Sequence, residues 1–423
     1  MLIEFRTTNF RSFRDEQVLS LVATADKTQV ETHTHATGLK AAPNLLRSAA
    51  IYGANASGKS NLIKALQYMR SVVLESATIV QPGQSYSVQP FRLDAESGKA
   101  PTSFEVTFML DGVRYEYAFA MTTQRIVRES LLVYKAFKPQ RWFERRFDEV
   151  TGKDIYEFGP GLKGAKNLWE SATRPNALFL SMAVQLNSEA LRPVYDWFAD
   201  RLIIINEQSP LSPDYSIQML KHEESRKGIC DFLRAAGISI ADIEVAAKRT
   251  VYRSVKIDLA TGKSEDGLDE QTIDELKFHH TTENGKAVFE LFDESSGTRN
   301  LLFLAGPVLD ILGKEVTLVV DELDTSLHTR LVQELVRLFH RPELNTGGAQ
   351  LILTTHDTAL LDAYGLFRRD QIWFVEKGVD QNSHLYPLTD FSPRKNEAIE
   401  RGYLQGRYGA LPFLRDALGM IDG

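Results

Sequence analysis

The chain opens with alternating apolar and polar positions, which predict a short strand pair over residues 2–20. Residues 46–52 form an apolar run that leads into a glycine-rich loop, and residues 59–76 then change to helical spacing. The apolar positions of this predicted helix are Leu62, Leu66, Met69 and Val73. The pattern therefore predicts a strand, a loop and a helix in direct succession.

Residues 103–134 return to alternation in three runs, with the turn signal Asp111-Gly112 between the first two. Such a series of short strands joined by tight turns is typical of an antiparallel meander. Because consecutive strands of a meander run in opposite directions, we expect this region to be separate from any parallel core sheet.

From about residue 166 to residue 245 the pattern becomes helical, as in NALFLSMAVQL and IADIEVAAK. Residues 261–275 are acidic and contain glycine, which predicts an exposed loop. A hairpin is expected around Glu283-Asn284-Gly285. Beyond it, apolar strands alternate with a helix: EVTLVV, residues 327–340, AQLILTT and QIWFVEK.

These elements predict an α/β fold with a mostly parallel core sheet, an antiparallel β meander and an inserted, mainly helical lobe. The expected division is residues 1–165 with the glycine-rich loop and the meander, residues 166–275 as the helical insertion, and residues 276–423 as the second α/β lobe. No sustained heptad repeat is present, so a long coiled-coil arm is not expected.

Composition adds a few constraints. The chain of 423 residues has a formal net charge of -7, so any contact with nucleic acid requires a local basic patch or a partner. Cys230 is the sole cysteine, which excludes an intramolecular disulfide and a cysteine-rich zinc site. Neither a signal-peptide core nor a membrane-spanning run stands out in the sequence, so we expect a cytoplasmic protein without membrane contact.

The glycine-rich loop carries the main chemical signal. Residues Gly53–Ser60, GANASGKS, match the phosphate-binding pattern GxxxxGK[ST]. Its glycines let successive N–H groups face phosphate oxygens, and the following helix directs its positive end at the same anion. Lys59 is expected to reach the β- and γ-phosphates, and Ser60 to bind Mg²⁺. The predicted nucleotide-binding residues here are Asn55, Gly58, Lys59, Ser60 and Asn61.

Two further strand ends complete the predicted site. Asp321 and Glu322 directly follow the apolar residues 316–320, where Asp321 would hold Mg²⁺ and Glu322 would polarise the water that attacks the γ-phosphate. His356 stands at the end of the next apolar strand and is predicted to sense the γ-phosphate. The absence of a guanine-reading NKxD motif favours ATP over GTP. The catalytic set is thus Glu322, His356 and Lys59, with ATP and Mg²⁺ as cofactors.

On these motifs the sequence resembles ABC-type ATPases of the RecF and SMC class, and in particular the AAA-labelled ATPases of bacterial anti-phage and abortive-infection systems. Residues 9–13, NFRSF, resemble a RecF-like strand and turn whose arginine, here Arg11, approaches the nucleotide. Residues 294–298, ESSGT, resemble the family's signature motif, although one of the two glycines of LSGGQ is missing. The resemblance implies a P-loop NTPase fold of the ABC/RecF-like head type.

The same resemblance implies a composite site. Ser296 and Gly297 would contact the γ-phosphate bound by a second protomer, so two chains would enclose the ATP. A glutamine between the loop and the meander would also bind Mg²⁺. Gln89 is the candidate for this role, with Gln81 and Gln84 as competitors.

Partners follow from the resemblance as well. Residues 323–328 would cross a dimer interface, which implies at least a homodimer and leaves a higher oligomer open. The expected effector is a nuclease of the toprim or HNH kind from a neighbouring gene, controlled by ATP in phage defence. Residues 401–409, rich in Gly, Tyr and Arg, resemble the family's closing segment, for which partner contact and simple packing are both open.

Two alternatives are left open. A RecF-like DNA-binding ATPase that acts in DNA repair is one, and the basic and aromatic residues 138–146 would fit a DNA contact. An ATP-binding subunit of a membrane transporter is the other, although the long segment between meander and signature motif argues against it. A nuclease gene, repair genes or a permease gene beside this one would separate these functions.

Overall fold

The computed structural model describes residues 1–135, 138–206, 212–257, 264–325, 327–394 and 397–411. Contacts divide the chain into two compact units. Unit 1 contains Met1–Ser209, Leu312–Asp324 and Leu335–Gly423, and unit 2 contains Pro210–Ile311 and Thr325–Glu334.

The first sheet of unit 1 is parallel apart from one edge strand, and it carries the phosphate loop. Its strands, in spatial order, are β11 (Leu202–Ile205), β15 (Thr317–Val320), β16 (Gln350–Thr354), β5 (Ser48–Tyr52), β17 (Ile372–Lys377) and the antiparallel β18 (Ser383–Pro387). Strand β5 lies between β16 and β17, which pair with it in parallel from either side. All three strands therefore end at the same edge, where α/β sheets bind their ligands.

Helix α2 (Lys59–Glu75) follows the loop as the spacing predicted. Leu62, Leu66, Met69 and Val73 are all buried. They belong to one apolar cluster that also contains Phe104 and Phe108 of the meander and Val319 and Ile352 of the parallel sheet. This shared core fixes the start of α2 against the edge of the parallel sheet, because burial of apolar surface is the dominant stabilising term.

The second sheet of unit 1 is antiparallel and contains the predicted strand pair and meander. Its spatial order is β10 (Lys153–Phe158), β9 (Gln140–Asp148), β8 (Ile126–Tyr134), β7 (Val113–Met121), β6 (Thr102–Leu110), β1 (Leu2–Thr8) and β2 (Gln17–Ser20). Asp111 and Gly112 turn between β6 and β7 with φ of 50° and 75°, as a two-residue hairpin requires. The predicted pair over residues 2–20 and the meander are confirmed.

Short elements complete unit 1. They are α1 (Val30–His33), β3 (Thr34–Ala36), β4 (Asn44–Leu46), α3 (Lys166–Ala172), α4 (Phe179–Gln185), α5 (Arg192–Asp196), the π-helix Trp197–Arg201, α10 (Ile399–Leu404) and the 3₁₀ turns Thr358–Leu360, Arg369–Gln371 and Leu388–Phe391. Helix α9 (Thr329–Phe339) has residues in both units.

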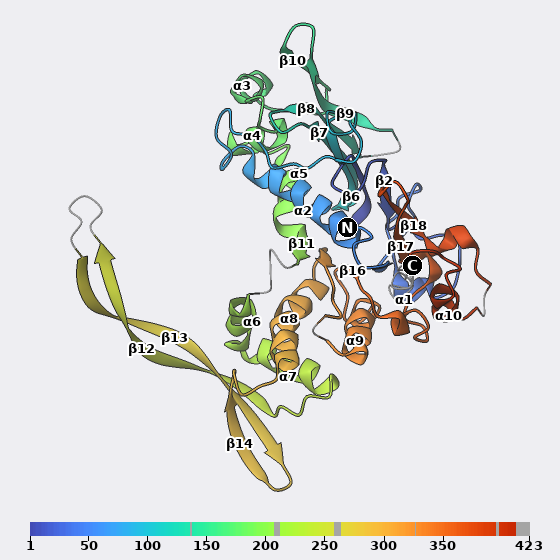
Figure 1. Ribbon diagram of the computed structural model, residues 1–423. Helices are drawn as coiled ribbons and strands as arrows, with labels where there is room; N and C mark the ends of the chain where they lie inside the picture. Colours follow the sequence, from blue (N-terminus) through green and yellow to red (C-terminus); the bar gives the residue numbers. More distant parts are fainter. Residues whose placement is uncertain (136–137, 207–211, 258–263, 326, 395–396, 412–423) are drawn as a thin grey trace, which may run out of the picture. The chain divides into compact units, whose positions relative to one another are not determined.

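Unit 2 combines helices with a long β ribbon (Figure 1). Its helices are α6 (Pro213–Leu220), α7 (Glu223–Ala235) and α8 (Ser296–Leu312), and its strands are β12 (Asp242–Ile257), β13 (Ser264–Thr282) and β14 (Gly285–Glu290). The expected hairpin around residues 283–285 joins β13 to β14.

Two local predictions are wrong in unit 2. IADIEVAAK lies largely in strand β12 instead of a helix, and much of the expected loop 261–275 lies in β13. The register pairs Ile243 with Phe278 and Val245 with Leu276, so a period of two and not 3.6 governs this segment. Pairing with the next strand along the chain decides the structure here, because short apolar runs carry an ambiguous local signal.

The predicted division at residues 165 and 275 stays a prediction, but the compact units follow other limits. Helices α3 to α5 belong to unit 1 together with the meander, whereas unit 2 begins at Pro210. No helix among the described residues has the length and apolar character that crossing a bilayer requires.

Candidate functional site

The phosphate loop is held in shape by its glycines and by its neighbours. Gly53 and Gly58 have φ of 157° and 121°. A side chain on Gly53 would clash with the carbonyl oxygen of Val375 in β17, and one on Gly58 would lie 2.7 Å from Ser383 Oγ in β18. Glycine is therefore required at both positions by close approach of the β17–β18 hairpin as well as by backbone conformation.

The hairpin also bonds directly to the loop. Ser383 Oγ donates to the carbonyl oxygen of Ser57 at 2.5 Å, and Ser383 N donates to the carbonyl oxygen of Ser12 at 2.8 Å. On the same side, Asn61 Nδ2 donates to Ser12 Oγ at 2.8 Å. The turn within NFRSF and the β17–β18 hairpin therefore brace the loop together, which sequence spacing alone did not predict.

Lys59 is buried, with 4% of its surface exposed. Its ammonium donates to the carbonyl oxygens of Gly53 at 2.7 Å and Ala54 at 3.1 Å. Burial lowers the pKa of Lys59 to about 8, against the opposing effect of Glu322, Asp321 and Asp324. A desolvated cation at the start of a helix is a strong attractor for phosphate, because little water screens it.

The acidic pair lies at the end of β15, as predicted. Thr354 Oγ1, at the end of β16, donates to Asp321 Oδ1 at 2.6 Å and accepts from the amide of Glu322 at 2.7 Å. Ser60 Oγ donates to the same Asp321 Oδ1 at 3.3 Å. Ser60 and Asp321 thus lie together, and their hydroxyl and carboxylate oxygens are the ligands that Mg²⁺ prefers.

His356 lies near the acids. Its amide donates to Asp324 Oδ2 at 3.1 Å, and its side chain is only partly buried. Burial and then the charge of Lys59 lower the pKa of His356, although the neighbouring acids oppose this. A pKa below the ordinary value leaves the imidazole neutral at pH 7, able to donate from one ring nitrogen and accept at the other.

A pocket of about 550 Å³ joins most of these groups. It is lined by Asn55, Ala56, Ser57, Gly58, Lys59, Ser60, Asn61, Glu322, His356 and Lys377. Lys377 was missed by the sequence reasoning, although it ends the apolar strand IWFVEK beside the loop strand. A cation at the end of a predicted core strand was the signal that could have identified it.

Other predicted residues lie outside this pocket lining. The amide of Arg11 donates to the carbonyl oxygen of Gln89 at 2.8 Å, so these two residues are neighbours through their backbones. Arg11 is next to Ser12, which contacts the loop helix. The roles of Arg11 in nucleotide binding and of Gln89 in metal binding stay predictions.

Ser296 and Gly297 form the first turn of α8 and belong to unit 2, whereas the pocket residues belong to unit 1. Ser295 caps this helix, because its Oγ accepts from the amide of Thr298 at 3.1 Å. Ser296 itself is exposed. The segment therefore presents a capped helix start to solvent, and its contact with a second protomer's phosphate stays a prediction.

Residues 138–146, the candidate DNA contact, are divided between core and surface, because Lys138, Arg141 and Arg146 are exposed while an aromatic and a basic side chain are not. Trp142 and Arg145 are buried. Arg145 Nη1 donates to the carbonyl oxygen of Ala177 at 2.6 Å, and its Nη2 pairs with Asp154 at 2.9 Å. These two side chains stabilise the meander instead.

The closing segment packs against the core sheet. The rings of Tyr403 and Tyr408 stack on Phe374 of β17, with centroids 5.3 and 5.8 Å away. Tyr386 OH donates to the carbonyl oxygen of Tyr408 at 2.9 Å. A side chain on Gly402 would lie 2.8 Å from the Tyr408 ring, so the glycine permits this packing.

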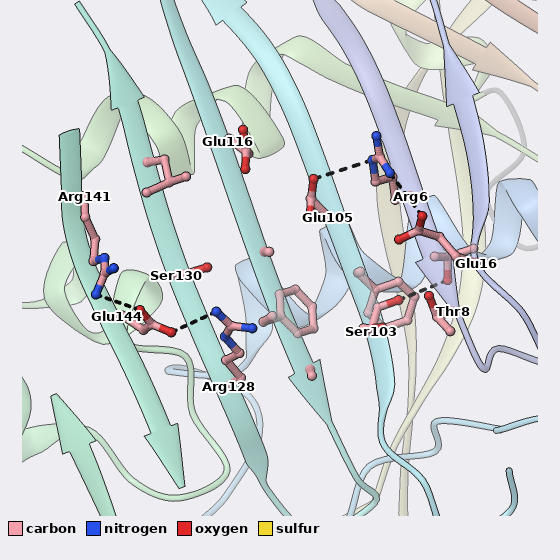
Figure 2. A pocket seen from close by; sticks show the side chains of 16 residues that line it. Arg6, Thr8, Glu16, Ser103, Glu105, Glu116, Arg128, Ser130, Arg141 and Glu144 are labelled. Carbon is pink, nitrogen blue, oxygen red and sulfur yellow. Dashed lines mark hydrogen bonds and ion pairs between the residues drawn. The ribbon is translucent and has the colours of Figure 1, made fainter. Parts of the chain in front are cut away.

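A second concavity of about 480 Å³ is lined by residues on one face of the antiparallel sheet (Figure 2). Its lining includes small residues such as Ala118, and most of its charged residues pair with one another. Arg128 contacts Glu144 at 2.9 Å, and Arg141 contacts the same carboxylate at 3.0 Å. Such paired charges are typical of the solvated face of an antiparallel sheet.

The parallel sheet, the phosphate loop between β5 and α2, and the acids at the end of β15 define a P-loop nucleoside-triphosphate-binding fold. The family described as "AAA domain, putative AbiEii toxin, Type IV TA system" matches residues 48–362, which is well over half of the chain. The chain belongs to this family. No curated protein matches it.

Solved structures with similar folds include the SMC head domain from Thermotoga maritima, with 14% identity, a TM-score of 0.43 and coverage of 91% of this chain and 98% of that one. The Smc head domain with an extended coiled coil bound to the C-terminal domain of ScpA, from Pyrococcus furiosus, has 13% identity, a TM-score of 0.40 and coverage of 96% and 99%. cbiO1 from Clostridium perfringens, part of the ABC transporter complex cbiONQ, has 12% identity, a TM-score of 0.29 and coverage of 90% and 96%. The fold assignment of this chain rests on its own strand order and loop.

Proposed function

We propose that this chain binds ATP with Mg²⁺, hydrolyses it, and uses the cycle as a switch. The observation that carries the proposal is the pocket in which Lys59, Ser60, Glu322 and His356 meet. Phosphoryl transfer to water requires a cation that binds phosphate, oxygen ligands for Mg²⁺ and a carboxylate that activates the water. The site contains all three kinds of group.

Each residue has a distinct role. The loop amides and Lys59 bind and orient the phosphate chain. Glu322 accepts the proton of the attacking water, and His356 donates a hydrogen bond to the γ-phosphate. Ser60 and Asp321 would hold Mg²⁺, with Gln89 as a proposed further ligand, and the ion would neutralise charge on the phosphate oxygens.

The switch needs a second chain. Ser296 and Gly297 of one protomer would contact the γ-phosphate bound by another, so ATP would favour a closed homodimer and ADP an open one. Such coupling works because the ligand then has different affinities for two states. The proposal requires a homodimer at minimum and is compatible with a higher oligomer built from such dimers.

We further propose that the closed state controls an associated effector in phage defence. The family description refers to a toxin of the AbiEii kind. A nuclease of the toprim or HNH kind, encoded beside this gene, is the proposed effector. The protein would act in the cytoplasm.

To test the proposal, the chain is copurified with the product of the neighbouring gene. The native protein is then compared with the Glu322→Gln variant. We expect turnover to fall by roughly 100- to 1000-fold, because the base that accepts the water's proton is lost, while ATP affinity is retained and the dimer becomes more stable. ATP turnover, nucleotide titration and light scattering measure the three properties.

Glu343→Gln is the matched control, because Glu343 is an exposed acid of unit 1 outside the pocket. Native turnover by Glu322→Gln would refute the role of Glu322. Duplex DNA that stimulates turnover without any partner, with binding that falls steeply with salt, would favour the repair function instead.

A further inference from the structure

One hydroxyl group joins the two acids of the site. Thr354 is the last residue of β16 and is completely buried. The register pairs Leu353 of β16 with Val320 of β15. The next residue is Thr354 on β16, and it is Asp321 directly after β15. This placement brings the threonine side chain to the point where β15 ends in Asp321 and Glu322.

The direction of its hydrogen bonds follows from chemistry. A hydroxyl has one proton to donate and lone pairs to accept. The ionised carboxylate of Asp321 can only accept, so Thr354 Oγ1 donates to it at 2.6 Å. The amide of Glu322 can only donate, so the same oxygen accepts from it at 2.7 Å. The hydroxyl therefore satisfies both groups at once.

Glu322 needs this support because its backbone is strained. Its φ is 52°, in the left-handed region, which is unfavourable for a residue with a Cβ. The following amide, of Leu323, donates to the carbonyl oxygen of Thr354 at 3.2 Å. Two bonds to one threonine thus hold the amides on both sides of the Glu322 Cα. Strain of this kind persists where surrounding contacts fix it, and it is common at functional sites.

We propose that Thr354 is a positioning residue that fixes the carboxylate of Asp321 and the backbone of Glu322 in one geometry. The inference rests on the proposed function of both acids. The bond to Asp321 Oδ1 orients this carboxylate beside Ser60, and the bond to the Glu322 amide directs the Glu322 side chain to the pocket. Loss of the hydroxyl would disturb magnesium binding and water activation together, and leave the phosphate loop intact.

The test compares Thr354→Val, which removes the hydroxyl at nearly constant shape, with Thr354→Ser, which keeps it. Thr355→Val is the matched control. Thr355 is equally buried and adjacent, but its Oγ1 accepts from the amide of Asp357 at 3.0 Å and contacts neither acid. Melting temperature and circular dichroism establish that each variant is folded.

For Thr354→Val we expect kcat to fall by on the order of 10- to 100-fold, the effect of misplacing reacting groups. The Mg²⁺ concentration at half-maximal binding of a fluorescent ATP analogue should rise by roughly 10-fold, as for other lost partners of metal ligands. Nucleotide affinity at saturating Mg²⁺ should stay within about 3-fold of native. Thr354→Ser and Thr355→Val should remain near native in both properties.

Native kcat and native Mg²⁺ dependence in Thr354→Val would overturn the inference. Equal losses in Thr354→Ser or in Thr355→Val would also overturn it, because packing would then explain the effect. A native chain that binds the nucleotide with Mg²⁺ but does not hydrolyse it would refute the proposed hydrolysis, while the Mg²⁺ midpoint would still decide the role of Thr354. If Thr354→Val does not fold, Thr354→Ala takes its place. A native Mg²⁺ concentration at half-maximal nucleotide binding in Thr354→Ala would then overturn the inference. A native chain that binds no nucleotide overturns both.

Discussion

The phosphate-loop site of unit 1 and the start of α8 in unit 2 are the two regions proposed to contact the phosphates of ATP, and their settings differ. In unit 1, Lys59 is buried and bonded, and Thr354 fixes the acids. In unit 2, Ser296 stands exposed on a helix that Ser295 caps. One region is a prepared pocket, whereas the other presents its donors outward.

This difference indicates that the pocket of unit 1 would supply most of the free energy of ATP binding. The start of α8 would instead control the change between open and closed dimers. A prepared pocket binds its ligand without further ordering, because its groups are already oriented. An exposed helix start contributes to the free energy of the dimer only when a second protomer brings its bound ATP to it. We therefore expect changes in unit 1 to weaken nucleotide binding and changes at the start of α8 to affect turnover more than affinity.

The largest expected effect is that of Lys59→Ala. Removing the buried cation should reduce ATP affinity by roughly 100-fold or more, because charge-assisted contacts contribute about 1.5–3 kcal/mol each. Isothermal titration with ATP and Mg²⁺ measures this. Lys64→Ala, on the same helix but outside the pocket, should bind as native does. Native affinity in Lys59→Ala would remove the main distinction between the two regions.

Gly297→Asp tests the outward-facing region. Turnover should fall by about 100-fold, the loss typical when a transition-state donor is removed, while ATP affinity changes little. Gly313→Asp is the control, because no atom lies within 4 Å of a Cβ added there. Mixing inactive Gly297→Asp chains with inactive Lys59→Ala chains should restore roughly a quarter of native turnover through mixed two-chain sites. No recovery would argue against a composite site.

The pH dependence of binding should reveal the desolvated lysine. The pKa of Lys59 is lowered to about 8, so the free protein loses this proton as pH rises above that value. Because phosphate prefers the charged form, affinity should be constant well below pH 8, begin to fall near pH 8 and then fall by up to about tenfold per pH unit above it. Lys59→Arg keeps its charge throughout and should give a flat profile. An equal slope in both proteins would assign the effect to another group.

Lys377→Met should have the smallest effect. The lysine is half-buried at the pocket, and its loss should weaken ATP binding by about 5-fold, the worth of a partly exposed ionic contact. Fluorescent-nucleotide titration at two salt concentrations measures the effect, with Lys64→Met as control. An unchanged affinity would show that Lys377 of β17 does not contribute to ATP binding.

Much of unit 1 could be predicted because its signals are local. Periodicity identified α2, the meander and the strands that end at the site. Unit 2 was harder, since β12 and β13 carry weak local patterns and are strands only because they pair with each other. The closing segment had no predicted role, because its aromatic residues find their partner, Phe374, only in the folded sheet.

The sequence by itself determined the phosphate loop and the two acids that follow β15, because each lies in one continuous stretch with a fixed chemical meaning. Only the tertiary structure decided that Thr354 joins these acids, that Ser383 braces the loop and that Lys377 lines the pocket. These groups come from separate strands. Their meeting depends on the order and register of the parallel sheet, which no local pattern specifies.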